Sequence, residues 1–163
     1  MQEKLTKSLE TYLMAIDALL EIKKTIIVKD VAEYLHFGGA TVSDAIKKLK
    51  EKGYVNYEPY STINLTELGE KVVIIKKYRH KTITQFLNKV LDIELKNAEY
   101  NAEQIEYSMT DDVLKRLVHF LDFMEQCSCT EPKWMQSCKT TLKTGQISKN
   151  CQSCSNKCCN DNN

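Results

Sequence analysis

The first 126 residues of this 163-residue chain contain no cysteine, and all seven cysteines lie between Cys127 and Cys159. The chain has only two prolines and five glycines. No apolar run approaches the ~18 residues that a membrane-spanning helix needs, and no signal peptide precedes the first amphipathic segment. We therefore expect a cytoplasmic protein with no membrane partner, whose first 126 residues fold without disulfides.

Motifs of the common enzyme classes are also missing. The chain has no P-loop, no nucleophile elbow and no His-Glu-x-x-His sequence. Its three histidines are scattered at positions 36, 80 and 119. We expect that the protein is not an enzyme.

The segment Val28–Gly69 carries the pattern of a winged helix-turn-helix. Apolar residues at helical spacing stand on both sides of His36–Gly39, which predicts a helix, a tight turn and a second helix. We expect the two adjacent glycines of that turn to release the backbone from the helical conformation. Alternating residues over 54–65 predict a two-stranded wing, and Thr66 is the predicted N-cap of the next helix.

The exposed side of the second helix predicts a surface for DNA. Hydroxyl and ammonium groups bind phosphates, and near the N-terminus of such a helix they reach base edges. A helical hairpin packed for its own sake would show the same apolar positions, so this prediction depends on the order of all the elements. The candidate DNA-binding residues are Gly39, Ala40, Thr41, Ser43, Asp44, Lys47 and Lys48.

Three helical segments are predicted after the wing. The first begins at Glu67, and at ~20 residues it would reach ~30 Å, further than a small winged domain needs. Such a helix commonly forms a dimer, and a two-fold dimer suits a palindromic DNA operator. Helices over residues 95–105 and Thr110–Met124 would complete the dimer interface, and no helical pattern follows Gln126.

The predicted fold is therefore mainly α. We expect a winged helix-turn-helix domain over residues 1–66, an all-helical metal-binding and dimerisation domain over 67–126, and a cysteine-rich tail over 127–163. Charge changes along the chain in a similar way: residues 1–90 carry 15 Lys and Arg against 11 Asp and Glu, residues 91–126 carry 3 against 9, and residues 127–163 carry 5 against 2. A basic front followed by an acidic middle is typical of a nucleic-acid surface joined to a cation-attracting region.

Glu103 and Glu106 form the first candidate metal site. They stand three positions apart, so on a helix both carboxylates point to one side, where they could chelate a cation with His80 as a third ligand. Taken alone, the pattern also fits a solvated helix face and a histidine that is satisfied by hydrogen bonds.

Several segments, in their order along the chain, carry a combined pattern. They are Leu9-Glu10-Thr11-Tyr12-Leu13, Val31-Ala32-Glu33-Tyr34-Leu35, Thr41-Val42-Ser43, Leu65-Thr66-Glu67-Leu68-Gly69, Tyr78-Arg79-His80 with Phe86-Leu87, and Ala102-Glu103-Gln104-Ile105-Glu106-Tyr107-Ser108-Met109-Thr110. Over residues 5–126 this pattern resembles the metal-dependent repressors of the diphtheria toxin repressor and manganese transport regulator family.

The resemblance implies a homodimeric repressor that binds double-stranded DNA and controls iron or manganese homeostasis. Bound Fe or Mn would fix the angle of the winged domains by population shift. Carried over by position, the ligands of this divalent metal would be His80, Glu103 and Glu106, with Glu99 as an ancillary candidate.

The chain departs from the family at three ligand positions. Thr11 stands where the family has an acidic or thioether ligand, Met14 occupies the neighbouring ligand position, and Tyr107 replaces a histidine. A phenol is a poor ligand near neutral pH because its pKa lies near ~10. The resemblance thus implies a reduced site, with one ion rather than two, or none.

The cysteine-rich tail offers a second candidate metal site. Cys151 and Cys154 form a C-x-x-C knuckle whose thiolates can hold one metal, and Cys127 with Cys138 can complete four sulfur ligands around zinc or an iron–sulfur cluster. Thiolates suit both groups, so the sequence does not choose between them. Two alternatives remain open: a thiol redox-sensing regulator whose cysteine pairs oxidise, and a tail with incidental cysteines.

Overall fold

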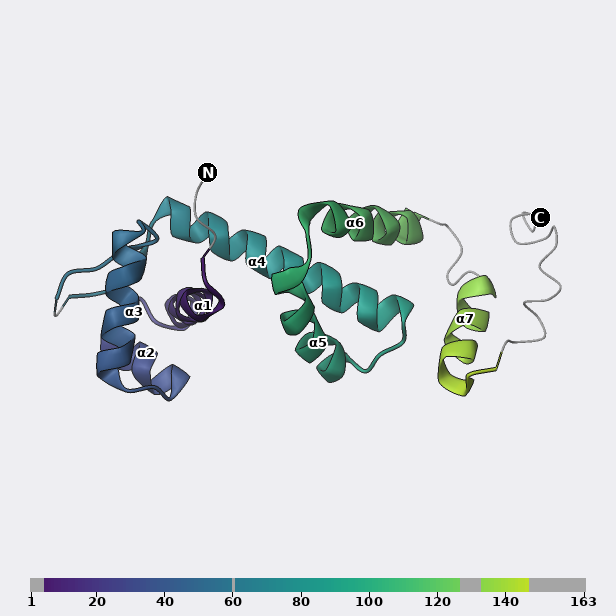
Figure 1. Cartoon of the computed structure of the whole chain (residues 1–163), viewed down its shortest axis with the longest axis horizontal. Helices are drawn as coiled ribbons and strands as arrows, with labels where there is room; N and C mark the ends of the chain where they lie inside the picture. Colours follow the sequence, from purple (N-terminus) through teal and green to yellow (C-terminus); the bar gives the residue numbers. More distant parts are fainter. Residues whose placement is uncertain (1–4, 60, 127–132, 147–163) are drawn as a thin grey trace. The chain divides into compact units, whose positions relative to one another are not determined.

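A computed structural model describes residues 5–59, 61–126 and 133–146, and it is mostly helical over these ranges (Figure 1), which confirms the mainly α prediction. The elements are α1 (Lys7–Ile22), α2 (Val28–Leu35), α3 (Gly39–Glu51), β1 (Val55–Asn56), β2 (Asn64–Leu65), α4 (Glu67–Gln85), the π-helical turn η1 (Phe86–Val90), α5 (Leu95–Ser108), α6 (Asp111–Gln126) and α7 (Lys133–Thr144). None of the helices in these ranges is long and apolar enough to cross a membrane. The chain divides into two compact units, Met1–Lys77 and Tyr78–Asn163.

The first unit is built on the apolar stripe of α1. Thr6 caps this helix, because the backbone N–H of Leu9 donates to Thr6 Oγ1 over 3.4 Å. The stripe packs against the buried faces of α2 and α3. Fully buried side chains of this core include Leu13, Ile16, Ile26, Val31, Val42, Ile46, Leu49 and Ile63.

The turn between α2 and α3 is present, but its mechanism differs from the prediction. The residue with a left-handed backbone is His36, with φ of 56°, whereas Gly38 is the extended N-cap of α3 and Gly39 is its first residue. The N–H of Phe37 donates to Ala32 O over 3.1 Å and closes the end of α2. Gly38 thus leaves the helical conformation, as predicted of the glycines, but Gly39 does not, and the left-handed residue of the turn is a histidine that the prediction did not include.

The predicted wing is a two-stranded antiparallel sheet. Val55 pairs with Leu65, and Asn56 pairs with Asn64. Ile63 donates its N–H to Ile26 O over 2.8 Å, which ties the second strand to the segment before α2. Val55 is buried and Asn56 is exposed, so the sheet presents one side to the core.

Thr66 caps α4, as predicted. The N–H of Gly69 donates to Thr66 Oγ1 over 3.1 Å, and this hydroxyl donates to Gly53 O over 2.7 Å. The helix begins in the first unit and ends in the second, where η1 continues it.

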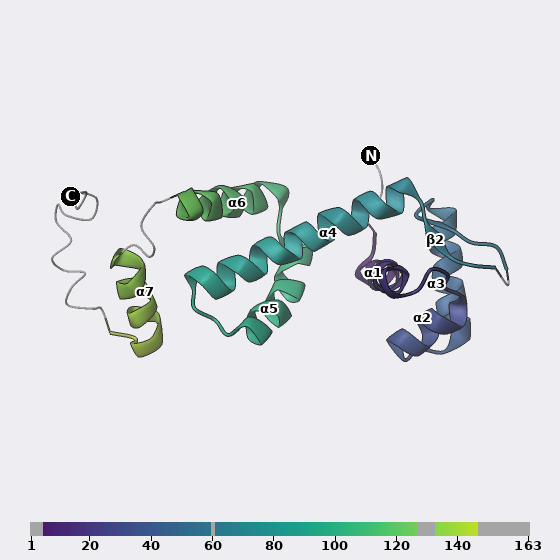
Figure 2. The same ribbon diagram turned by 180° about the vertical axis from the view of Figure 1, so that it is seen from behind.

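The second unit contains the end of α4, η1, α5, α6 and α7. Its core includes Ile83, Leu87, Ala98 and Ala102 where α5 lies beside η1 (Figure 2). The prediction that no helical pattern follows Gln126 was wrong, because α7 forms over Lys133–Thr144 in a segment that contains several lysines and threonines. Met135 on α7 is buried, and Lys143 pairs with Asp92 over 2.5 Å.

Candidate nucleic-acid interface and metal centre

The helix α3 has two distinct sides. Val42, Ala45, Ile46 and Leu49 are buried in the first unit. The opposite side carries the sequence-predicted DNA-binding residues: Gly39, Ala40, Thr41, Asp44, Lys47 and Lys48 are exposed, and Ser43 is half-buried. The structure thus places all of these candidates on one helix, outside the core.

The N-terminus of α3 is suited to an anion. Gly38 provides no side-chain cap, and no acidic residue occupies the first turn. Uncapped N–H groups and the helix dipole together attract phosphate oxygens. Lys47 lies 3.5 Å from Asp44, and both side chains are more than half exposed, so this ion pair is weak and leaves the lysine able to contact DNA.

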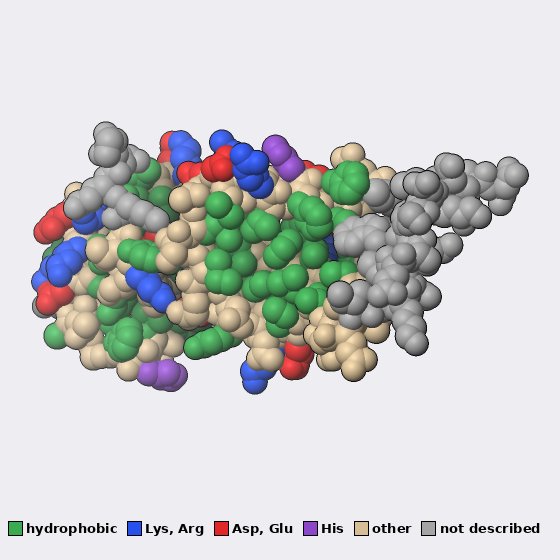
Figure 3. All heavy atoms as spheres, turned by 45° about the vertical axis from the view of Figure 1, so that its right-hand side comes forward, with side chains coloured by type: hydrophobic (Ala, Val, Ile, Leu, Met, Phe, Trp, Pro, Cys, Tyr) green, Lys and Arg blue, Asp and Glu red, His purple; other side chains and the backbone are tan. Residues whose placement is uncertain are grey.

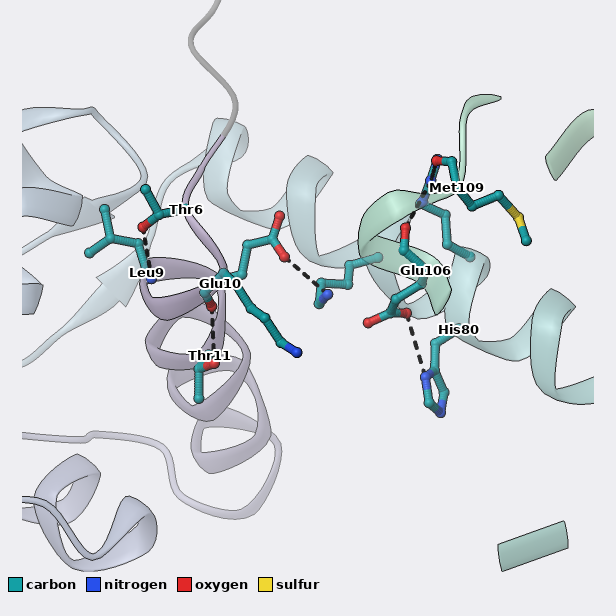
Figure 4. A network of polar contacts seen from close by, with 10 residues as sticks. Thr6, Leu9, Glu10, Thr11, His80, Glu106 and Met109 are labelled. Carbon is teal, nitrogen blue, oxygen red and sulfur yellow. Dashed lines mark hydrogen bonds and ion pairs between the residues drawn. The ribbon is translucent and has the colours of Figure 1, made fainter. Parts of the chain in front are cut away.

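His80 and Glu106 are the two predicted metal ligands that the structure brings together. His80 lies on α4 and Glu106 lies on α5, with 3.5 Å between His80 Nδ1 and Glu106 Oε2 (Figure 4). The Glu106 side chain is only 4% exposed, because it continues the buried face that Ala98 and Ala102 begin at spacings of four residues. A buried carboxylate beside an imidazole provides two ligands of the kinds that divalent transition metals accept.

Glu99 and Glu103 do not join this pair. Both side chains are exposed on α5, about two turns and one turn, respectively, before the buried Glu106. In the ranges that the structure covers, no three His, Cys, Asp or Glu residues gather closely enough to hold a metal ion. The described residues therefore provide two ligands for a metal ion, His80 and Glu106, and not a complete ligand set.

The three positions that depart from the family have structural roles or locations of their own. The Thr11 hydroxyl donates to Lys7 O over 3.1 Å within α1 (Figure 4). Met14 is half-buried against the core of the first unit, and Tyr107 is 38% exposed on α5. Thr11 and Met14 thus serve the helix and its packing.

Arg79 is a site residue that sequence reasoning missed. Its guanidinium donates from Nη1 to Asp111 Oδ1 over 2.6 Å and from Nη2 to Glu106 O over 3.1 Å and to Met109 O. The side chain is 14% exposed. The only signal in the sequence was its place directly before His80, where an arginine is usually interpreted as a surface charge.

Cys138 is the single candidate of the cysteine site that falls within the ranges covered by the structure. It lies on α7, is half-buried and forms no disulfide. The other three candidates, Cys127, Cys151 and Cys154, lie outside the described residues.

The second unit also exposes large apolar side chains. Figure 3 shows hydrophobic side chains gathered over one face of the protein. An apolar surface that is exposed in a single chain commonly marks an interface with a partner. The exposed residues of this unit include Leu95, Tyr100, Ile105, Tyr107, Val113, Phe123 and Leu142.

Two family models cover most of the chain. The iron dependent repressor N-terminal DNA binding domain matches residues 4–63, and the iron dependent repressor metal binding and dimerisation domain matches residues 66–135. The chain belongs to the iron-dependent repressor family. It is therefore a metal-responsive, DNA-binding transcriptional regulator with a divalent metal cofactor, which confirms the family and the general function that the sequence resemblance implied.

Known members of this family align with about three quarters of the chain. The uncharacterized HTH-type transcriptional regulator MJ0568 of Methanocaldococcus jannaschii is 37% identical over 72% of this chain and 95% of its own length. The regulator MntR of Geobacillus thermodenitrificans is 29% identical over 74% of this chain and 85% of its own length.

Two solved structures show the same fold. The metal-dependent transcriptional regulator MtsR has a TM-score of 0.65 at 29% identity, and the manganese regulator SloR has a TM-score of 0.61 at 28% identity. Each alignment covers 73% of this chain and 55% of the other chain, so the present chain spans about half the length of these two proteins.

Proposed function

We propose that the protein is a homodimeric repressor in the cytoplasm that binds a palindromic operator when Mn²⁺ or Fe²⁺ occupies a site built on His80 and Glu106. The 3.5 Å approach of these two side chains from different helices is the observation that carries the proposal. Its regulatory targets are genes of manganese or iron homeostasis.

The ligand pair suits a regulatory site. Glu106 is buried beside His80, and a positive charge next to a buried carboxylate is favourable. A bound divalent cation would supply that charge and would join α4 to α5 through the two side chains. Glu103 and Glu99 precede Glu106 by three and seven residues on the same helix, so they would become further ligands only by turning their exposed side chains toward a bound ion.

Manganese is the ion that the relatives support best. SloR is described as a manganese regulator, and a further solved relative at 26% identity is a manganese-dependent repressor in complex with manganese. Carboxylate ligands also suit Mn²⁺, whereas imidazole is shared among several transition metals.

DNA would be contacted by α3. Its exposed side offers hydroxyl and ammonium groups, and its N-terminus attracts phosphate. We assign the apolar surface of α5 and α6 to the homodimer, since a two-fold dimer would present two copies of α3 to two half-sites.

We also propose that Cys127, Cys138, Cys151 and Cys154 hold zinc or an iron–sulfur cluster. Four thiolates are a complete ligand set for either group. Cys138 is half-buried on α7, and the Lys143–Asp92 ion pair connects α7 to the segment between η1 and α5. A cysteine held in this way within the second unit is compatible with the proposal.

Calorimetric titration with Mn²⁺ tests the helical site. We expect Glu106→Gln, which removes the charge at constant shape, to weaken Mn²⁺ binding at least tenfold. Glu125→Gln is the matched control, because Glu125 pairs with Lys89 on the surface over 3.0 Å. Tyr107→His should tighten binding by adding an imidazole next to Glu106. Equal affinities for the wild type and Glu106→Gln would contradict the proposed site.

A further inference from the structure

Arg79 and His80 are consecutive residues of α4 with different partners. His80 Nδ1 lies 3.5 Å from the carboxylate of Glu106, whereas Arg79 binds the backbone at the other end of the same glutamate. The guanidinium also reaches Met109 O and Asp111 Oδ1, so it binds the corner where α5 ends and α6 begins. The carboxylate and the carbonyl oxygen of Glu106 thus both face neighbouring residues of α4 (Figure 4).

The end of α5 provides the acceptors for this contact. The last carbonyl groups of a helix have no donor within the helix, and a cation near them is favoured by the helix dipole. The helix α5 ends at Ser108 with Met109 as its C-cap, so the carbonyl groups of Glu106 and Met109 belong to its last turn and cap. A guanidinium can serve several such acceptors at once, because its five N–H groups lie in a rigid plane.

The burial of Arg79 strengthens its hydrogen bonds to the end of α5. The Arg79 side chain is 14% exposed, so solvent screens its hydrogen bonds to the two carbonyl groups little. By contrast, the Asp111 side chain is 86% exposed and contributes less to holding the corner. The hydrogen bonds to the Glu106 and Met109 carbonyl groups therefore dominate the contact.

We propose that Arg79 is a positioning residue that holds the last turn of α5 against α4 and thereby sets the separation of His80 and Glu106 before a metal binds. This inference rests on the proposed metal function. Groups that orient metal ligands are worth about tenfold to hundredfold in metal affinity.

Considered only as a charge, Arg79 is expected to weaken metal binding, whereas a positioning group is expected to strengthen it. A fixed positive charge close to a cation site repels the incoming ion, so removing it should tighten metal binding if charge were its main influence. Removing a positioning group should weaken metal binding. The direction of the change therefore separates the two roles.

The test compares Arg79→Gln and Arg79→Lys with the control Arg116→Gln in the full chain. Arg116 pairs with Asp112 over 3.0 Å, and both side chains are more than 70% exposed, so the control removes the same charge from a surface site. Lysine keeps the charge of Arg79 but not the planar array of donors. Circular dichroism identifies any variant that fails to fold.

Two measurements decide the proposal. In the metal-free protein, amide hydrogen exchange over residues 105–109 should be faster in both Arg79 variants than in the wild type and in Arg116→Gln. In calorimetry with Mn²⁺, both Arg79 variants should bind about tenfold more weakly or worse. Tighter binding by Arg79→Gln, or wild-type affinity in Arg79→Lys, would overturn the proposal.

The hydrogen exchange measurement needs no metal, so it separates failure of this inference from failure of the metal function. If the wild type binds no Mn²⁺, the function proposed above fails. Unchanged exchange over residues 105–109 in both Arg79 variants would overturn the role of Arg79 in either case.

Discussion

Gly69 and Tyr54 approach each other so closely that a Cβ atom on Gly69 would stand 2.2 Å from the carbonyl oxygen of Tyr54. The same carbonyl accepts the N–H of Thr66 over 3.1 Å. The first turn of α4 is therefore seated directly on the backbone that leads into β1. Only glycine allows this approach, because the obstructing atom belongs to the backbone rather than to a flexible side chain.

We predict that Gly69→Ala destabilises the protein by about 1–3 kcal/mol or more, since overpacking forces the backbone apart. Gly39→Ala is the control: no atom lies within 4 Å of its added Cβ, and the φ of Gly39 is not positive. Alanine is the better helix former, so the control should be neutral or slightly stabilising. Urea denaturation measures the stability of both variants. Equal unfolding midpoints would contradict the close contact between Gly69 and the Tyr54 carbonyl group.

Asp30 gives a prediction about pH. One carboxylate oxygen accepts a hydrogen bond from Lys23 Nζ over 2.5 Å, and the other accepts the N–H of Ile27 over 2.8 Å. The Lys23 hydrogen bond, followed by that of Ile27, holds the pKa of Asp30 below its ordinary value. The unfolded chain then binds the proton more tightly than the folded chain, so this contribution to stability is present above pH ~4 and is lost as the pH falls through the lower folded pKa.

We therefore expect Asp30→Asn to lower the unfolding midpoint in urea at pH 7, and the difference from the wild type to shrink as the pH falls below about 4. Urea titrations at pH 7 and at acidic pH measure this change. A difference that is constant over the whole range would mean that the Asp30 charge does not stabilise the start of α2.

Periodicity predicted most of the helices because each one packs a single apolar stripe on a core. It could not predict the left-handed conformation of His36, because two glycines lie close by at positions 38 and 39 and have the lower steric cost for such a backbone. Nor could periodicity show that Glu106 is buried while Glu103 is exposed. Ala98, Ala102 and Glu106 are spaced four residues apart in the sequence, but only the packing of α4 against α5 reveals that this face is the covered one. The helix α7 carries Trp134, Cys138 and Leu142 at spacings of four residues, but it is a short segment among polar residues, and the prediction that no helical pattern follows Gln126 overlooked it.

Salt dependence tests the DNA surface. We expect the double variant Lys47→Ala, Lys48→Ala to bind DNA more weakly and with a shallower dependence on salt, because each lost phosphate contact removes about 0.9 from the slope of log K against log[salt]. Lys96→Ala with Lys115→Ala removes two exposed lysines from α5 and α6 and should leave the slope unchanged. Equal slopes for the two double variants would place Lys47 and Lys48 outside the interface.

Metal analysis after anaerobic purification tests the cysteine site. A colourless protein that contains zinc, or a brown protein that contains iron and sulfide, would each support a four-thiolate site. Cys151→Ser should lose this metal, whereas Cys159→Ser should retain it. A wild-type protein without metal or cluster in the tail would contradict the site and support a thiol redox function instead.

The most direct test of the central claim is the dissociation constant of a DNA duplex that the Mn²⁺-loaded protein selects from a random-sequence library. It should be measured by fluorescence anisotropy with Mn²⁺ and with a chelator, for the wild type and for Glu106→Gln. We predict that Mn²⁺ tightens binding by the wild type at least tenfold and leaves binding by Glu106→Gln unchanged. Equal affinity of the wild type with Mn²⁺, with Fe²⁺ and with chelator would contradict the proposal that a metal bound by His80 and Glu106 controls DNA binding.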